Sequence, residues 1–298
     1  MASGIGIACI GIAVLDRTYT LPRLPDGPGK YIGAGYEEVG GGMAATASVA
    51  VARLGGRSTW IGRTGDDATG ATLRSGLAAH GVAHCPALVA PGGASPSSAV
   101  LVDAAGERIL ALFPGAGLVE EPRFDLGDAA AVLADPRWVV GAAHGFALAR
   151  AAGLPCVLDA DCGAPEVLHR LAPQADHVVF SEEGLQEFTG AAEAAAGLAI
   201  AASRLKAVLA VTLGAAGSLW WRDGAAHPLP APRVAARDTT GCGDVFHGAY
   251  TLAIAEGAAV EAAARFATAA AALKAEAGSG WNAAPDRAAV AALLARGW

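Results

Sequence analysis

Short apolar runs alternate with segments of helical periodicity along most of the chain. IACIGIAV predicts a buried first strand, and AAVLA, PCVLDAD, HVVFS and AVLAVTLG predict later strands, each followed by a helical segment. GMAATASVAVARLG has small and apolar residues at helical spacing and stops at Gly55-Gly56, a typical helix end. This alternation predicts an α/β fold with a doubly wound, mostly parallel sheet covered by helices on both faces.

Two stretches interrupt this alternation. DRTYTLPRLPDGPGKYIGAGYEEV is rich in Pro and Gly, and SPSSAVLVDAAGERILALF predicts a hairpin that turns at Ala104-Ala105-Gly106. Neither pattern suits a doubly wound sheet. We therefore expect a single domain over residues 1–298, with a small β-sheet lid formed by inserted segments at about 16–38 and 95–114.

Composition narrows the classes of function. The chain is 53% hydrophobic, but charges or glycines interrupt every apolar run well before the roughly 20 residues that span a bilayer. The N-terminus lacks a positively charged region, which favours a buried strand over a signal peptide. A net charge of -7 and scattered basic residues argue against a nucleic-acid partner. Five cysteines without a Cys-x-x-Cys pair predict reduced thiols and a cytoplasmic protein.

The stretch DTTGCGD carries the strongest chemical signal. It follows the strand-like PRVAA and precedes the helical GDVFHGAYTLAIAEG, so its glycines fall at a helix N-terminus. The first backbone N–H groups of a helix lack partners, and the helix dipole there favours negative charge. The stretch therefore predicts a cradle for phosphate oxygens. It is not a P-loop, because no Gly-Lys-Ser/Thr follows.

Acidic residues flank this cradle. Asp244, on the first helical turn, could take the proton from a hydroxyl that attacks a phosphoryl group held on the neighbouring N–H groups. Asp238 and Thr240 could hold the turn or bind a monovalent cation through their oxygens. A simple helix cap is the alternative for an isolated Gly-x-Gly-Asp. The full run between a strand and a helix favours catalysis.

DTTGCGDVFHGA resembles the C-terminal signature of the ribokinase/PfkB carbohydrate kinase family. The upstream EVGGGMAATASVAVARLG resembles that family's N-terminal glycine-rich signature. The resemblance covers nearly the whole chain and implies a ribokinase-like fold with a β-sheet lid. It also implies ATP as co-substrate, Mg²⁺, a monovalent cation as a further candidate ion, and a homodimer that pairs through the lid.

The resemblance assigns roles to individual residues. Asp244 would be the catalytic base, with an anion hole formed by Gly241, Cys242 and Gly243. The sugar would be bound by Asp16, near the end of the first strand, together with Gly41 and Gly42. The nucleotide-phosphate turn in VTLGAAG would consist of Thr212, Gly214 and Gly217.

One stretch departs from the family pattern. Many members carry Asn-x-x-Glu, linked to magnesium and phosphate, whereas FSEEGLQEFTG has Ser181 and Gly184 at those positions. Glu182 or Glu183 could act on the metal through water, because Mg²⁺ often keeps several waters. The residue that replaces the family glutamate stays open.

Within the family, GIAVLDR, GKY, VLADPRW, VLDAD and HVVFSEEGL are similar to the sulfofructose kinase branch, which also has Ser-Glu-x-Gly. This resemblance implies transfer of the γ-phosphoryl group to a primary hydroxyl of an anionic ketose, 6-deoxy-6-sulfofructose. Lys30 and Arg137 are the candidate cations for its sulfonate. The stretch Leu112-Phe113-Pro114 offers no amide where the branch has an asparagine.

Other functions remain open at this point. The same signatures suit a PfkB kinase for fructose, fructose phosphate, 2-keto-3-deoxygluconate or a nucleoside. A non-catalytic sugar or nucleotide sensor is a rival of another class, and the intact Gly-x-Gly-Asp argues against it. A dinucleotide-binding dehydrogenase is excluded because no Gly-x-Gly-x-x-Gly opens the first helix.

Overall fold

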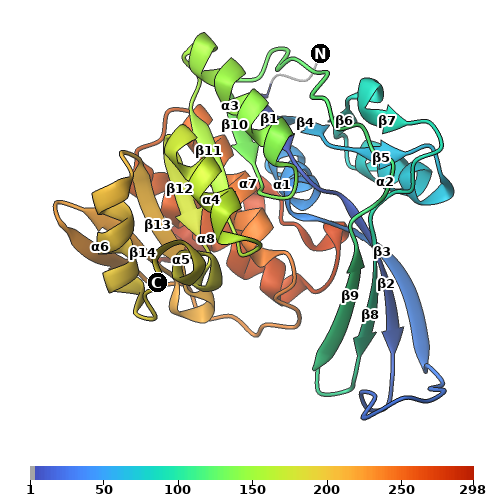
Figure 1. The fold of residues 1–298 in the computed structure, drawn as a ribbon. Coiled ribbons are helices and arrows are strands. Elements are labelled where there is room, and N and C mark those ends of the chain that lie inside the picture. Colours follow the sequence, from blue (N-terminus) through green and yellow to red (C-terminus); the bar gives the residue numbers. More distant parts are fainter. Residues whose placement is uncertain (1–3) are drawn as a thin grey trace.

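The main body of the protein is a nine-stranded sheet. We describe residues 4–298 in a computed structural model (Figure 1). Seven neighbouring strands are parallel and two at one edge are antiparallel. In spatial order they are β15 (Ala225–Leu229), β14 (Ser218–Arg222), β13 (Val208–Thr212), β12 (His177–Phe180), β11 (Cys156–Ala160), β10 (Ala131–Ala134), β1 (Gly6–Ile10), β4 (Arg57–Ile61) and β6 (Ala83–His84).

Helices cover both faces of this sheet, so it separates two apolar cores. Ile7 and Cys9 of β1 point into one core, whereas Ala8 and Ile10 point into the other, as the period of a strand requires. One face is covered by α1 (Met43–Arg53), α2 (Ala68–Ala79), α7 (Cys242–Ala255), α8 (Val260–Ala277) and α9 (Arg287–Arg296). The other face is covered by α3 (Val139–Ala152), α4 (Pro165–Leu171), α5 (Glu182–Thr189) and α6 (Ala194–Arg204). The predicted doubly wound α/β fold is confirmed.

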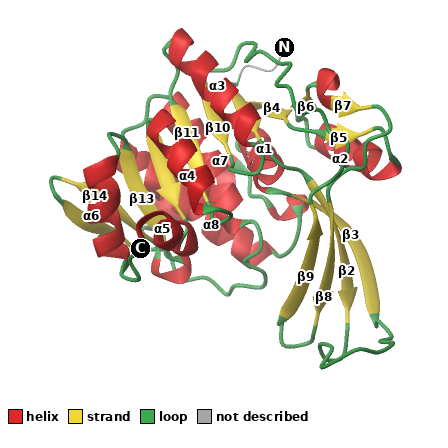
Figure 2. Ribbon diagram, in the orientation of Figure 1, coloured by secondary structure: helices red, strands yellow, loops and turns green. Residues whose placement is uncertain are grey.

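A separate sheet of four strands projects from the main body (Figure 2). Its order is β3 (Gly35–Gly41), β2 (Val14–Thr20), β8 (Ser97–Val102) and β9 (Arg108–Phe113). The hairpin turns at Gly106, which has a φ of +83°. We call these four strands the lid. They form a single layer, and a two-stranded piece, β5 (Thr64–Gly65) with β7 (Val89–Ala90), lies near their base.

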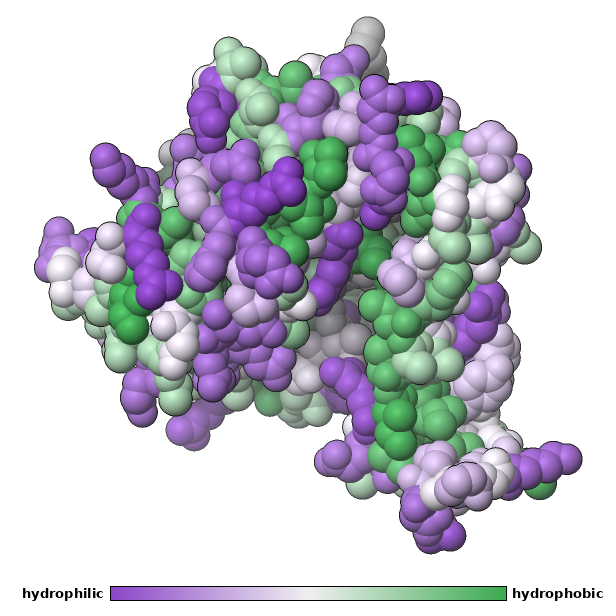
Figure 3. Space-filling model, viewed as in Figure 1, coloured by the Kyte–Doolittle hydropathy of each residue, from purple (hydrophilic) through white to green (hydrophobic). Residues whose placement is uncertain are grey.

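The two faces of the lid differ. Cross-strand register places Tyr19 opposite both Tyr36 and Leu101, and Leu101 opposite Ile109, so these side chains share one face. Tyr19, Tyr36 and Ile109 are exposed by 40, 55 and 45%. Hydrophobic side chains follow the length of the lid in Figure 3. We call the face of Tyr19 the outer face, because the residues that alternate with it line a cavity described below.

The root of the lid is anchored by the last part of the chain. The indole ring of Trp281 lies on Gly40 of β3, where an added Cβ would come within 2.4 Å of the ring. The ring also contacts Gly76 of α2, and its Nε1 donates to Thr46 Oγ1 of α1 at 3.2 Å. Three parts of the chain that are distant in sequence, residues 40–46, Gly76 and Trp281, therefore meet at one aromatic side chain.

Three local predictions were wrong. IACIGIAV is not one strand, because β1 ends at Ile10 and Ile12 N donates to the buried Asp135 carboxylate at 2.8 Å. Asp16 consequently lies on β2 of the lid rather than at the end of the first strand. PRVAA is irregular, since its neighbour Arg237 donates its N–H to α8 rather than to a strand. AVLAVTLG is followed by a short 3-10 turn and the β14–β15 hairpin instead of a helix.

Two broader observations concern the whole described chain. None of the helices in residues 4–298 is long and apolar enough to cross a membrane. All five cysteines are free thiols, as the spacing predicted.

Candidate active site

The carboxyl ends of the parallel strands meet the DTTGCGD loop at one edge of the sheet. Helix α7 begins there and packs beneath β1, β10 and β11. Gly241 is its N-cap, with a left-handed φ of +77° that favours glycine. Cys242 N donates to Thr239 O at 3.2 Å, and Val245 N donates to Gly241 O at 3.0 Å. Within residues 4–298, the N–H groups of Gly243 and Asp244 have no hydrogen-bond acceptor, so they are available to an anion.

Beside these N–H groups lies a cavity of about 310 Å³ between the sheet edge and the lid. Asp244 reaches its wall from α7, and Asp16 reaches it from β2. The structure thus brings the predicted base and the predicted sugar-binding acid into one cavity. The other predicted residues in its lining are Gly41, Gly42, Asp238, Thr240 and Gly241.

Asp244 is half-buried at the wall of the cavity. Burial raises the pKa of Asp244 to about 7, and the nearby Asp159 carboxylate adds to this rise, while His247 opposes it. A carboxyl group with a pKa near neutrality can accept a proton from a hydroxyl and release it again. This environment is the one that a general base requires.

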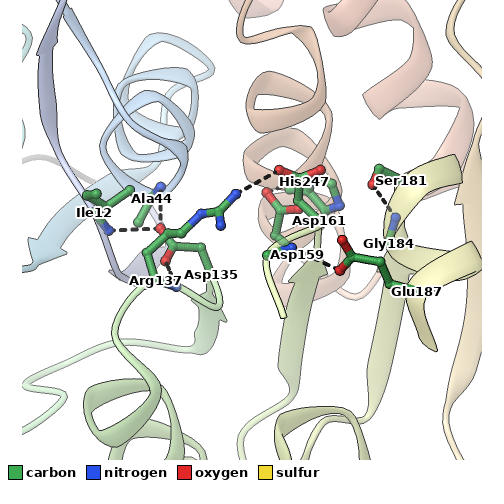
Figure 4. Close-up of polar contacts among 11 residues, drawn as sticks. Ile12, Ala44, Asp135, Arg137, Asp159, Asp161, Ser181, Gly184, Glu187 and His247 are labelled. Atoms are coloured by element: carbon green, nitrogen blue, oxygen red, sulfur yellow. Dashed lines mark hydrogen bonds and ion pairs between the residues drawn. The ribbon is translucent and has the colours of Figure 1, made fainter. Parts of the chain in front are cut away.

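His247 lies one turn after Asp244 and is buried beneath the loop (Figure 4). Its Nδ1 lies 2.7 Å from Gly243 O and 3.2 Å from an Asp159 carboxylate oxygen, and its Nε2 lies 3.2 Å from Val179 O. These contacts fix the imidazole between α7, β11 and β12. The ring therefore packs under the predicted anion hole rather than reaching the cavity.

Asp135 joins the ends of three elements. One carboxylate oxygen accepts from Ile12 N at 2.8 Å and from Ala44 N at 3.1 Å, and the other accepts from Arg137 N at 2.8 Å (Figure 4). An added Cβ at Gly11 would lie 2.0 Å from this carboxylate. Asp135 thus holds the point where β1 leaves the sheet toward the lid. Sequence reasoning missed this role, because no local pattern marks a contact across more than a hundred residues.

Asp16 is held in place by its own neighbours. It accepts a hydrogen bond from Ser98 Oγ of the adjacent strand β8. Burial raises the pKa of Asp16, and the Ser98 hydrogen bond opposes this rise. A Cβ at Gly41 would lie 2.3 Å from an Asp16 carboxylate oxygen, and Gly42 has a φ of +92°. The two glycines therefore make room for Asp16 and for the turn into α1.

Arg108 is a residue of the cavity that the sequence analysis did not select. It lies on β9 of the lid and donates to Thr240 Oγ1 in the DTTGCGD loop. This contact joins the lid to the loop across the cavity. The sequence contained a signal for this residue. In the predicted hairpin, Arg108 pairs with Val102 and therefore lies on the same face of the lid as Val102 and Val100.

The two predicted sulfonate-binding cations lie outside the cavity lining. Lys30 is exposed in the loop between β2 and β3, at the tip of the lid. Arg137 follows β10 and pairs with Asp161 at 3.3 Å (Figure 4). The structure does not bring them together with Asp16. The cations that line the cavity are Arg108, Arg237 and Lys274.

The predicted nucleotide turn also lies at the carboxyl ends of the parallel strands, directly after β13. Thr212 ends β13, and its Oγ1 donates to Phe180 O of β12 at 3.3 Å. Gly214 and Gly217 have φ values of +53° and +98°. An added Cβ at Gly217 would come within 2.1 Å of Leu229 O, so the turn needs glycine there.

The magnesium candidates lie in the first turn of α5, where both Glu182 and Glu183 are exposed. Ser181 is the N-cap of this helix and accepts from Gly184 N at 3.0 Å, so the two residues that replace the family motif form a helix cap. Residues 4–298 contain no cluster of three or more His, Cys, Asp or Glu side chains that could hold a metal. This donor set fits an ion carried mainly by nucleotide phosphates and water.

Comparison with known proteins places this site in a family. The family model described as "pfkB family carbohydrate kinase" matches residues 5–287. A fructokinase from Klebsiella pneumoniae is 32% identical over 257 residues, which is 80% of each chain. A ribokinase from Bacillus subtilis is 26% identical over 276 residues, covering 90% of this chain and 92% of the relative.

Solved structures agree with these relatives. A crystal structure from Agrobacterium tumefaciens has a TM-score of 0.93 at 36% identity, and the match covers 99% of this chain and 98% of the other. Arabidopsis thaliana ribokinase complexed with ribose and ATP has a TM-score of 0.83 at 25% identity, with 99% of both chains covered. Fold and site together define an ATP-dependent sugar kinase. The chain belongs to the PfkB family of carbohydrate kinases.

Proposed function

We propose that this kinase transfers the γ-phosphoryl group of ATP to a primary hydroxyl of a ketohexose bound in the cavity between Asp16 and Asp244. The observation that carries the proposal is the recessed Asp244 beside the free N–H groups of its own helix. A base and an anion cradle at one point are what phosphoryl transfer requires.

In this proposal, Asp244 accepts the proton of the attacking hydroxyl as its oxygen bonds to the γ-phosphorus. The bond from the γ-phosphorus to the bridging oxygen breaks, and ADP leaves. The N–H groups of Gly243 and Asp244 stabilise the charge on the equatorial oxygens of the phosphoryl group. Gly241 and Cys242 shape the cradle, since the Cys242 N–H already donates to Thr239. Asp16 accepts hydrogen bonds from sugar hydroxyls.

The nucleotide is proposed to lie along the sheet edge, with its phosphates between α7 and the turn of Thr212, Gly214 and Gly217. Magnesium supplies charge neutralisation on the phosphates when it is bound. Asp161 and Glu183 are proposed to orient its waters. Burial raises the pKa of the Cys162 thiol to about 11, and both carboxylates add to this rise, so they lie near Cys162 at the end of β11 and the start of α5.

The relatives and the cavity lining support different sugars. The fructokinase relatives favour a neutral ketohexose. The cations Arg108 and Arg237 in the cavity lining suit an anionic ketose, of which 6-deoxy-6-sulfofructose is the specific candidate. We replace Lys30 and Arg137 by Arg108 as the proposed partner of an anionic group, because Arg108 lines the cavity together with Asp16.

We also propose a homodimer formed through the lid. The outer face of the lid exposes aromatic and aliphatic side chains on a single-layer sheet. Both edge strands, β3 and β9, present unpaired backbone groups. Burial of such a face in a second copy would remove apolar surface from water.

The test is ADP release with Mg-ATP and a panel of acceptors: fructose, 6-deoxy-6-sulfofructose, fructose 6-phosphate, 2-keto-3-deoxygluconate, ribose and adenosine. Turnover on one or both of the first two compounds is the expected result, and their ratio measures the preference for an anion. Turnover only on ribose, adenosine or the sugar acid would overturn the ketohexose assignment. No turnover on any acceptor, with sugar binding retained, would favour a sensor.

A further inference from the structure

A fully buried lysine lies at the wall of the active-site cavity. Lys274, in the last turn of α8, is 1% exposed, whereas the other lysines of the chain, Lys30 and Lys206, are exposed. Lysine is almost never buried without a partner, because removing an ammonium from water is costly. The position of Lys274 therefore needs a specific explanation.

The ammonium of Lys274 lies where α8 ends and the DTTGCGD loop passes. Its Nζ donates to Gly278 O at 2.5 Å. The loop docks on the same helix end, because Arg237 N and Asp238 N both donate to Ala275 O, at 2.8 and 3.2 Å. The C-terminus of a helix carries partial negative charge and favours a cation. This end of α8 is thus a natural cation position beneath the loop.

Electrostatics places the same groups together. Burial raises the pKa of the Cys242 thiol to about 11; the Lys274 ammonium opposes this rise, and the Asp238 and Asp244 carboxylates add to it. Lys274, Asp238 and Asp244 therefore act on one point of the loop. All three also line the cavity.

The oxygens predicted for a monovalent cation already have donors. Asp238 Oδ1 accepts from Thr240 N at 2.8 Å, and Thr240 Oγ1 accepts from the Arg108 guanidinium. The Gly278 carbonyl accepts from Lys274. A further cation at these oxygens would compete with these donors and approach two fixed positive charges, which repel it. The predicted pair of Asp238 and Thr240 does not fit a free monovalent ion.

We infer that the Lys274 ammonium serves as a built-in monovalent cation, which holds the DTTGCGD loop in its anion-binding form and makes the kinase independent of K⁺. The inference rests on the proposed phosphoryl transfer for its effect on rate. The effect of the Lys274 charge on the stability of the fold does not depend on phosphoryl transfer. Lys274 is a positioning residue, since it acts through the loop rather than on the sugar.

The experiment compares wild type with Lys274→Met, which keeps most of the packing of the apolar stem and removes the charge. Lys274→Ala is the second variant, because its smaller side chain leaves room for an ion. Lys206→Ala is the matched control at an exposed lysine. Each protein is assayed in K⁺, NH₄⁺ and tetramethylammonium chloride at equal ionic strength.

We expect wild-type and Lys206→Ala turnover to vary less than about twofold among the three salts. In tetramethylammonium, Lys274→Ala should lose about tenfold or more in kcat, and K⁺ or NH₄⁺ should restore part of it. Thermal unfolding gives a second readout: K⁺ should raise the Tm of Lys274→Ala above that in tetramethylammonium, but leave wild type unchanged.

Strong activation of wild type by K⁺ would overturn the inference. So would variants that keep full turnover and show no difference in Tm among the salts. If wild type turns over no sugar in any salt, the proposed function fails. The Tm comparison still decides the role of Lys274 in that case.

Discussion

The cavity has two walls of opposite construction. The wall at the sheet edge carries Asp244 on α7, which packs beneath β10 and β11, and these two strands are buried along their whole length. The lid wall is one layer thick, and β9 is exposed from Arg108 to Phe113. The proposed base therefore lies on the buried wall, and contacts that can vary with the substrate lie on the exposed one.

The sharpest test of the buried wall is Asp244→Asn, which should have the largest effect on rate. Loss of the base should lower kcat by about 10³-fold or more, while the affinity for sugar changes little. ADP release and calorimetric titration with the sugar measure the two quantities. Asp223→Asn, at an exposed turn, is the control for loss of one carboxylate. Equal kcat in wild type and Asp244→Asn would remove Asp244 as the base.

The pH dependence tests whether the sheet edge sets the pKa of Asp244. A base must be deprotonated to act, so kcat/KM should rise about tenfold per pH unit below about 7 and level off above it. A pH–rate profile in a buffer of constant ionic strength measures this. A flat profile between pH 5 and 8 would contradict a raised pKa, since an ordinary carboxyl is ionised over that whole range.

The raised pKa of Asp244 also predicts how the stability of the protein depends on pH. The pKa of Asp244 rises on folding from 3.8 to about 7, so its protonated form stabilises the folded state fully below 3.8. That stability is lost as the pH rises through about 7. Asparagine carries no charge at any pH. The Tm of Asp244→Asn should therefore exceed that of wild type at pH 8, and the difference should shrink toward pH 4.

Two cations test the lid wall: Arg108, which lines the cavity, and Lys30, which lies at the tip of the lid. Arg108→Ala should raise the KM for ATP or for an anionic sugar about tenfold, because it removes the contact to the DTTGCGD loop. Lys30→Ala, at the tip of the lid, should change KM less than about twofold. Steady-state kinetics of both variants decide the matter. A larger rise in KM for Lys30→Ala than for Arg108→Ala would return the anion-binding role to Lys30.

The smallest effect on chemistry is expected at the outer face of the lid. Tyr36→Ser together with Ile109→Ser should shift the mass in solution from dimer to monomer, while the fold of the main body is kept. Light scattering measures the mass, and circular dichroism checks the fold. A wild-type protein that is already monomeric would contradict the proposed dimer.

The comparison of the two walls also shows what the sequence could predict. Periodicity and turn residues predicted the parallel sheet, the hairpin at Gly106 and the helix that begins at DTTGCGD, because each depends on neighbours in the chain. Asp135, Arg108 and Lys274 were missed as site residues, because their partners lie in other elements or beyond the end of a helix. Lys30 and Arg137 share the right chemistry but not the right position, and sequence alone does not supply distances across a cavity.

The contact of Trp281 with the root of the lid has a consequence for biosynthesis. The ribosome releases the chain from its N-terminus, so β1, β2 and β3 emerge long before the indole that packs on Gly40 and bonds to Thr46. A nascent chain can begin to pair its central strands, but its lid lacks the Trp281 contact until residue 281 leaves the exit tunnel. A chain that stops before residue 281 therefore lacks the aromatic contact that fixes β3 of the lid against α1 of the main body.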